Sequence, residues 1–142
     1  MKKSTNGHNK NIFLDTDVLI SSILSSRGAS YWLIHKTENL NLYTNSETLE
    51  ELNKVVTRNK LTADKIYLEK LIVNTDRTEY SDFQSLLNDR NDEHILRGAV
   101  NSNSEYLVTF NKKDYKIDLI RATFNIITLS PGEFLQYLRS LN

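Results

Sequence analysis

The chain of 142 residues contains no cysteine, one proline and four glycines. The lack of cysteine excludes a disulfide scaffold, a cysteine-ligated zinc site and a thiol nucleophile. So little proline and glycine also excludes a collagen-like or low-complexity chain. Neither sign of charge is in excess, because 18 basic residues face 18 acidic ones. The molecule as a whole is therefore no basic nucleic-acid binder, and a polyanion would have to meet a local positive patch.

Long apolar runs are missing as well. No stretch approaches the roughly 18 apolar residues that cross a membrane, and no apolar segment of a secretory signal follows the polar start. Hydrophobic residues make up 39% and charged residues 25%, which is typical of a folded globular chain. We expect a cytoplasmic protein without membrane contact, with a polar tail over residues 1–10 and a single domain over residues 11–142.

Short apolar runs alternate with patterns of helical period along the chain. The predicted strands are residues 12–14, 40–44, 106–110 and 125–129, with a weak edge strand at 83–87. The predicted helices are 18–24, 29–37, one that Ser46 caps, 62–74, 92–101 and one that begins at Pro131. Ser130 and Glu133 have the spacing of a capping box around that proline. This alternation predicts an α/β fold with three layers, α/β/α, around a mainly parallel sheet of about five strands.

Three acidic residues stand where a charged carboxylate is costly. Asp15 follows the apolar run Ile12–Leu14, at the strand end where parallel sheets place their sites. Asp92 shares a helix face with the apolar residues that follow it. Glu51 lies about 110° from the centre of its helix's apolar face, closer than its acidic neighbours. In the ordinary alternatives the turn after Asp15 only caps a helix, through Asp17 or its neighbour, and the other two acids are solvated.

The next predicted strand also ends at oxygen-bearing side chains. Asn111 and Asp114 follow it and can offer ligand oxygens, although Asp114 could instead cap a short helix. Oxygen ligands without cysteine or paired histidine favour a hard cation, Mg²⁺ or Mn²⁺, over zinc. His8, His35 and His94 have no partner at helical spacing, and we expect His94 on the outward side of its helix.

The remaining motifs are limited. There is no nucleophile elbow and no glycine-rich phosphate loop, so a metal-activated water is the nucleophile that remains. Basic residues gather at 53–70 and 112–121, where they could hold phosphates or simply form solvated faces. Tyr43 and Tyr115 are the only aromatic candidates for base stacking at the predicted site edge.

In order and spacing these motifs resemble those of PIN-domain ribonucleases, in the branch of toxin components of bacterial toxin–antitoxin pairs. The resemblance covers about residues 11–138. It rests on Phe13–Ser21, Ser46–Val55, Asp89–Ala99, Tyr106–Asp114 and Ile127–Leu135. It implies a parallel sheet with the first strand central, Mg²⁺ or Mn²⁺ as cofactor, an RNA substrate, a homodimer and a cognate antitoxin.

The resemblance also implies roles for single residues. Asp15, Glu51 and Asp92 correspond to the family's acidic metal-binding residues, and Thr16 and Thr109 to polar residues that line the site. Many family members carry aspartate where this chain has Asn111, and asparagine is frequent where it has Asp17. The fourth ligand is then either Asn111 or Asp114, or the site is weakened, and Asp17 adds one carboxylate that could compensate.

The resulting hypothesis is a metal-dependent endoribonuclease. In it, Asp15 and Asp92 hold the principal metal, Glu51 positions a second metal or the attacking water, and Asn111 or Asp114 completes the set. A catalytically lapsed PIN domain that binds protein or RNA is the main alternative.

Two other classes fit less well. A haloacid-dehalogenase-type phosphatase needs threonine or valine where Leu19 stands, and an acid pair after the threonine strand, which is missing. A phospho-receiver needs a lysine after its fifth strand, and residues 129–131 contain none.

Overall fold

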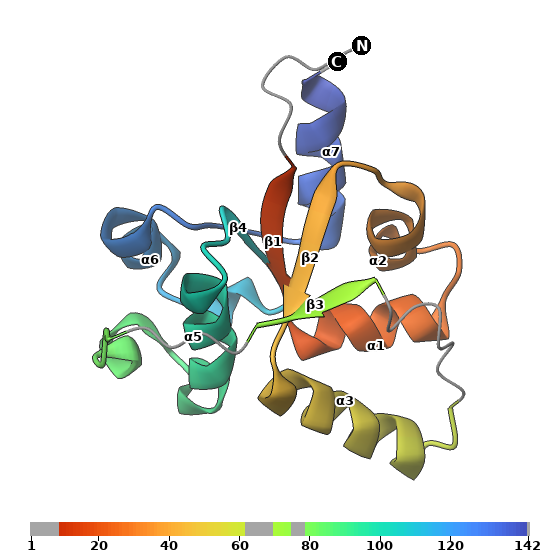
Figure 1. Cartoon of the computed structure of the whole chain (residues 1–142), viewed down its shortest axis with the longest axis horizontal. Helices are drawn as coiled ribbons and strands as arrows, with labels where there is room; N and C mark the ends of the chain where they lie inside the picture. The colour runs from red at the N-terminus through yellow and green to blue at the C-terminus, as the bar shows by residue number, and fades with distance from the viewer. Residues whose placement is uncertain (1–8, 62–69, 75–78, 142) are drawn as a thin grey trace.

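Five parallel strands form the centre of the computed structural model, which describes residues 9–61, 70–74 and 79–141 (Figure 1). The strands are β1 (Lys10–Leu14), β2 (Leu40–Thr44), β3 (Leu71–Val73), β4 (Tyr106–Val108) and β5 (Ile127–Leu129). Their order is β3-β2-β1-β4-β5, so the first strand is central, as the resemblance implied. The chain adds β2 and β3 on one side of β1 and β4 and β5 on the other. Sites in parallel sheets form where the strand order reverses in this way, here between β1 and β4.

Strand register brings the ends of β1 and β4 together. Leu14 pairs with Val108, and the N–H of Asp15 donates a hydrogen bond of 3.0 Å to the carbonyl of Val108. Asp15 and Thr109, each the residue after its strand, therefore leave the sheet side by side. The main chain alone thus places two of the predicted site residues at one edge.

Helices cover both faces of the sheet. They are α1 (Thr16–Leu24), α2 (Ala29–Tyr31), the π-helical η1 (Trp32–Lys36), α3 (Ser46–Arg58), α5 (Glu93–Asn101), α6 (Ile117–Phe124) and α7 (Pro131–Ser140). Three short 3₁₀ helices join them, η2 (Phe83–Leu86), η3 (Arg90–Asp92) and η4 (Lys112–Asp114). In Figure 1, α5 and α6 lie on one side of the sheet and α1, α2 and α3 on the other. The predicted three-layer α/β/α architecture is confirmed.

Two cores follow from the alternation of side chains along β1. Ile12 and Leu14 pack with residues of α1, α3 and α7, whereas Phe13 between them packs with residues of α5 and α6. Successive side chains of a strand point to opposite faces, which is why one short apolar run serves both cores. Burial on both faces also explains why residues 12–14 of this strand are all apolar.

Gly98 allows α5 to approach the sheet closely. A Cβ atom at this position would overlap the ring of Phe13 and crowd the side-chain amide of Asn45. That amide donates a hydrogen bond of 2.9 Å to the backbone carbonyl of His94, and Asn45 also caps α3 through its Oδ1. The cap of α3 is therefore Asn45 rather than Ser46, which is the first residue of the helix.

Three other local predictions need correction. Residues 71–73 form β3 and not the end of a helix, because they pair with β2; the rest of that predicted helix, 62–69, lies outside the described residues. The predicted edge strand at 83–87 is the 3₁₀ helix η2, and only Leu87 makes an isolated antiparallel bridge, to Tyr115. Lys10 belongs to β1 and not to the predicted tail.

Other boundaries moved by short distances or were missed. β4 ends at Val108 and β5 begins at Ile127, both inside the predicted runs, and helix α6 was not predicted. The capping box at Ser130 and Glu133 is present, with Pro131 as the first helical residue. Among the described residues, no helix has both the length and the apolar character needed to cross a membrane.

Candidate active site

Asp15 is the most enclosed acid of the predicted set. It follows β1, caps α1, and is 7% exposed. Its Oδ1 accepts from the N–H of Thr16 at 2.6 Å, while its Oδ2 accepts from the hydroxyls of Thr109 at 2.8 Å and Tyr115 at 2.9 Å. Burial raises the pKa of Asp15, although these three hydrogen bonds lower it in part. The carboxylate is thus fixed in position by three donors, one from the start of α1 and two from the segment that follows β4.

Asp17 stands beside it on the first turn of α1. Its Oδ2 accepts from the backbone N–H of Phe110 at 3.2 Å and from Nδ2 of Asn111 at 2.8 Å. Its Oδ1 is buried and has no hydrogen-bond partner among the described residues. Burial, and then the charge of Asp15, raise the pKa of Asp17 to about 7. The residue that caps α1 is Asp15, so a capping role for Asp17 or Thr16 is wrong.

A second acidic group forms where η3 and η4 meet. One carboxylate oxygen from each of Asp89, Asp92 and Asp114 lies within 4.8 Å of the others. Burial, followed by the charges of Asp15, Asp114 and Asp89, raises the pKa of Asp92 to about 7. Its Oδ2 is buried without a hydrogen-bond partner in the described part of the chain. Asp92 is therefore not the solvated first-turn acid of the alternative interpretation.

The other two members of this group keep local roles as well. Asp89 caps η3 by accepting from the N–H of Asn91 at 2.9 Å. Asp114 lies inside η4, so its predicted alternative as a helix cap is wrong. Its backbone carbonyl accepts from the N–H of Asn88 at 2.8 Å, which ties the two loops together. This tie, between segments distant in sequence, brings Asp114 next to Asp92.

Glu51 is an exposed residue of α3 whose side chain reaches two other predicted or neighbouring groups. Its Oε1 accepts from the hydroxyl of Thr16 at 2.9 Å and also contacts Nε2 of His94. The His94 side chain is only 13% exposed, so the expectation that it faces outward is wrong. His94 also acts electrostatically on Asp15 and lowers the pKa of that carboxyl group.

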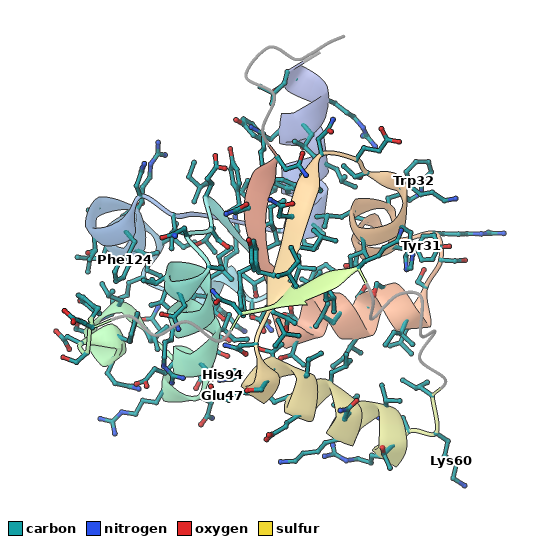
Figure 2. The ribbon with its side chains drawn as sticks, in the orientation of Figure 1. Tyr31, Trp32, Glu47, Lys60, His94 and Phe124 are labelled. Carbon is teal, nitrogen blue, oxygen red and sulfur yellow. The ribbon has the colours of Figure 1, made fainter. Side chains whose placement is uncertain are left out.

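Contacts between α3 and α5 account for the place of His94. Arg97, three residues after it on α5, binds Glu47 of α3 at 3.0 Å and Glu93 of its own helix at 3.0 Å. Figure 2 shows His94 and Glu47 near one another at the junction of these helices. The helical wheel could not anticipate this, because α3 covers the flank of α5 that a lone helix would expose to water.

The loop after β4 supplies the remaining polar residues. The Thr109 hydroxyl is fully buried; it donates to Asp15 and accepts from the N–H of Asn111 at 3.0 Å. Tyr115 is 3% exposed, so it cannot stack on a base, and sequence reasoning missed its hydrogen bond to Asp15. Burial raises the pKa of its hydroxyl, which therefore stays a donor at neutral pH. Tyr43, the other stacking candidate, packs against the core that contains Phe13.

The donor set fits a divalent metal. The polar groups that converge here are carboxylates, hydroxyls and one amide, and hard cations such as Mg²⁺ prefer such oxygens. Buried carboxylate oxygens normally have hydrogen-bond partners, but among the described residues Oδ1 of Asp17 and Oδ2 of Asp92 have none, which suits them to bind a cation. Burial and then repulsion by the neighbouring acids raise the pKa of Asp92, and binding of a cation would relieve this repulsion.

A comparison with models of known protein families identifies the family of this chain. A family model described as PIN domain matches residues 11–113. This chain belongs to the PIN-domain family. Among the curated proteins searched, none matches it.

A PIN-domain fold also agrees with solved structures. The chain is similar to one in the crystal structure of VapBC2 from Rickettsia felis bound to a DNA fragment from their promoter, with 22% identity and a TM-score of 0.59. The similarity covers 83% of this chain and 96% of that chain, and it shows that the two share a fold. The match of the PIN domain covers Asp15, Glu51, Asp92 and Asn111, whereas Asp114 follows its last residue. Neither comparison favours a phosphatase.

Proposed function

We propose that this PIN domain is a Mg²⁺- or Mn²⁺-dependent endoribonuclease. The observation that supports the proposal most is the carboxyl group of Asp92. One of its oxygens is buried without a hydrogen-bond partner among the described residues, and it faces the charges of Asp15, Asp89 and Asp114. A protein that gains nothing from a cation would not be expected to keep these acids together, since they repel one another.

In this proposal the carboxylates divide the work. Asp15 and Asp92 hold the principal metal, and Asp114 supports Asp92 from η4. When bound, a divalent cation lowers the pKa of water and stabilises the charge that develops on a phosphodiester. The hydrogen bonds that Thr16 and Thr109 make keep the carboxylates of Glu51 and Asp15 directed into the site.

Glu51 is the residue suited to accept a proton. Both of its contacts, with Thr16 and with His94, reach Oε1. Oε2 is then the oxygen that takes the proton from the attacking water. With a side chain 48% exposed, Glu51 is also open to solvent and substrate, unlike Asp15. General bases of this kind typically contribute about 10²- to 10⁴-fold to the rate.

We further propose that the protein is the toxin of a bacterial toxin–antitoxin pair. The resemblance of its motifs to the toxin branch supports this role, as does the fold that it shares with a chain of VapBC2. The proposal implies RNA as substrate in the cytoplasm, a cognate antitoxin as protein partner, and a homodimer. It also treats residues 11–142 as a single domain.

Cleavage by purified protein tests the enzymatic proposal. A panel of total and structured RNAs is incubated with Mn²⁺ or Mg²⁺, or with EDTA, beside the variant Asp92→Asn. We expect cleavage that needs metal and that falls at least about 100-fold in the variant, because metal-assisted hydrolysis loses a ligand. The matched control is Asp118→Asn, which changes an exposed acid on α6 in the same way. Cleavage by Asp92→Asn at the wild-type rate would contradict the proposal, as would cleavage in EDTA.

A further inference from the structure

The carboxylate of Asp17 is held on one side and free on the other. Two N–H donors from the loop after β4, the backbone of Phe110 and Nδ2 of Asn111, both reach Oδ2, at 3.2 and 2.8 Å. Two donors on one oxygen fix the plane of the carboxyl group. The other oxygen, Oδ1, must then point in a set direction, which is how outer hydrogen bonds orient a metal-ligating carboxylate.

The second oxygen of Asp17 differs from the first in having no hydrogen-bond donor among the described residues. Oδ1 of Asp17 is buried and lacks a hydrogen-bond partner in the described ranges, although a buried carboxylate oxygen normally has one. The charge of Asp15 acts on Asp17, and the Asp15 carboxylate already accepts hydrogen bonds from Thr16, Thr109 and Tyr115. A cation bound by both carboxylates would remove the repulsion between them.

Asn111 is the hydrogen-bond donor of this pair, and Asp17 is the acceptor. A carboxylate without its proton can only accept, so its contact with Asp17 directs the nitrogen of the Asn111 amide, and not its oxygen, toward that acid. The backbone N–H of Asn111 is fixed by the hydroxyl of Thr109 at 3.0 Å. Asn111 is thus a well-placed donor to Asp17, and the atom that it turns toward this acid is its amide nitrogen, which cannot bind a metal as a carboxylate oxygen does.

We propose that Asp17 supplies the additional metal-binding carboxylate of this site and that Asn111 is a positioning residue that orients it. The inference rests on the proposed function, because it concerns the same metal site. The two residues have different roles: Asp17 on α1 is the metal ligand, and Asn111 in the loop after β4 holds the Asp17 carboxylate in position. The metal would be a divalent cation that prefers oxygen, such as Mn²⁺.

An exchange of the two side chains tests this assignment. Asp17→Asn removes the carboxylate, whereas the double variant Asp17→Asn/Asn111→Asp returns one to the opposite side of the same pair, with net charge and side-chain volume conserved. Asn111→Ala removes only the donor. Each protein is titrated with Mn²⁺ alone by calorimetry, and its metal-dependent rise in melting temperature and its cleavage of RNA are measured in parallel.

We expect Mn²⁺ affinity to fall at least about tenfold in Asp17→Asn and less in Asn111→Ala. The double variant should return to within about threefold of the wild-type affinity. Loss of Mn²⁺ affinity in a folded Asp17→Asn protein, followed by recovery on exchange, is a result that a merely structural Asp17 would not give. A thermal melt without metal shows whether each variant folds, and the double variant keeps the test decisive if Asp17→Asn alone does not.

Two results would overturn the inference. One is wild-type Mn²⁺ affinity in Asp17→Asn; the other is loss in that variant with no recovery in a folded double variant. Failure of the ribonuclease proposal looks different: Mn²⁺ binds through Asp17, and the exchange restores it, yet the wild type cleaves no RNA.

Discussion

At the scale of single residues, the site depends on contacts between segments that are far apart in the chain. Asp15 and Asp92 could be predicted because each interrupts an apolar pattern, and such a pattern is local in sequence. Tyr115 and His94 could not, since their partners Asp15 and Glu51 lie 100 and 43 residues away. Only the packing of α3 against α5 and the fold of the loop after β4 reveal them. The sequence suggested Asp17 either as a cap or as an added carboxylate that compensates for Asn111, and it could not show the orphaned oxygen, which has no signature in sequence.

Glu51 and His94 should respond differently to substitution. Glu51→Gln removes the proposed base, and we expect the cleavage rate to fall about 100-fold or more. His94→Ala leaves the base in place but removes a contact that orients it, so a smaller fall of about tenfold is expected. His94→Gln, which can still donate to Glu51, should recover part of this loss.

The measurement is the initial rate of RNA cleavage at saturating and at limiting RNA, which separates kcat from KM. Glu50→Gln is the matched control, because Glu50 is an exposed acid on the same helix beside Glu51. A role for Glu51 in catalysis would be excluded by a rate equal to that of this control. Equal losses in His94→Ala and His94→Gln would mean that the histidine does not act by holding the carboxylate.

At the scale of elements, prediction succeeded where a local pattern decides the structure. The capping box of α7 and the strands around the centre of the sheet follow from residues within one short segment. β3 was misassigned because Leu71–Val73 is apolar without a period of its own, and its pairing with β2 decides its conformation. The 3₁₀ helix η2 was read as a strand for the same reason, because short apolar runs do not distinguish the two.

The close packing of α5 on β1 predicts opposite effects for two glycines. Gly98→Ala should destabilise the protein by about 1–3 kcal/mol, because the added Cβ meets Phe13 and Asn45 and forces them to move. This exceeds the gain of about 1 kcal/mol that alanine brings inside a helix. Gly132→Ala is the control: nothing lies within 4 Å of a Cβ there, so stability should stay the same or rise.

Urea denaturation of both variants measures these changes. Since Asn45 donates to the backbone of His94, a shift of α5 should also disturb the junction that carries His94. RNA cleavage by Gly98→Ala is therefore expected to fall along with its stability. A Gly98→Ala protein as stable as Gly132→Ala would show that α5 and β1 are packed less closely than described.

At the scale of the whole molecule, the acid cluster sets how stability depends on pH. The pKa values of Asp17 and Asp92 are raised from 3.8 to about 7 in the folded protein. Between these limits the folded state binds more protons than the unfolded state, so these groups make stability fall as pH rises. Without metal, the melting temperature should therefore decrease from pH 5 to pH 8. Mn²⁺ should reverse much of this decrease, because it neutralises the ionised carboxylates.

Ionisable groups outside the acid cluster also affect stability in this pH range, so the informative quantity is a difference between variants. Asp92→Asn removes one of the two acids, and its melting temperature in EDTA should exceed that of the wild type by about 2 °C or more at pH 8, and by less at pH 5. The same substitution should abolish most of the stabilisation by Mn²⁺. If the melting temperatures of wild type and variant depended equally on pH in EDTA, the pKa of Asp92 would be the same in the folded and unfolded states. The repulsion that supports a metal at this sheet edge would then be absent, and the edge would have to be explained without one.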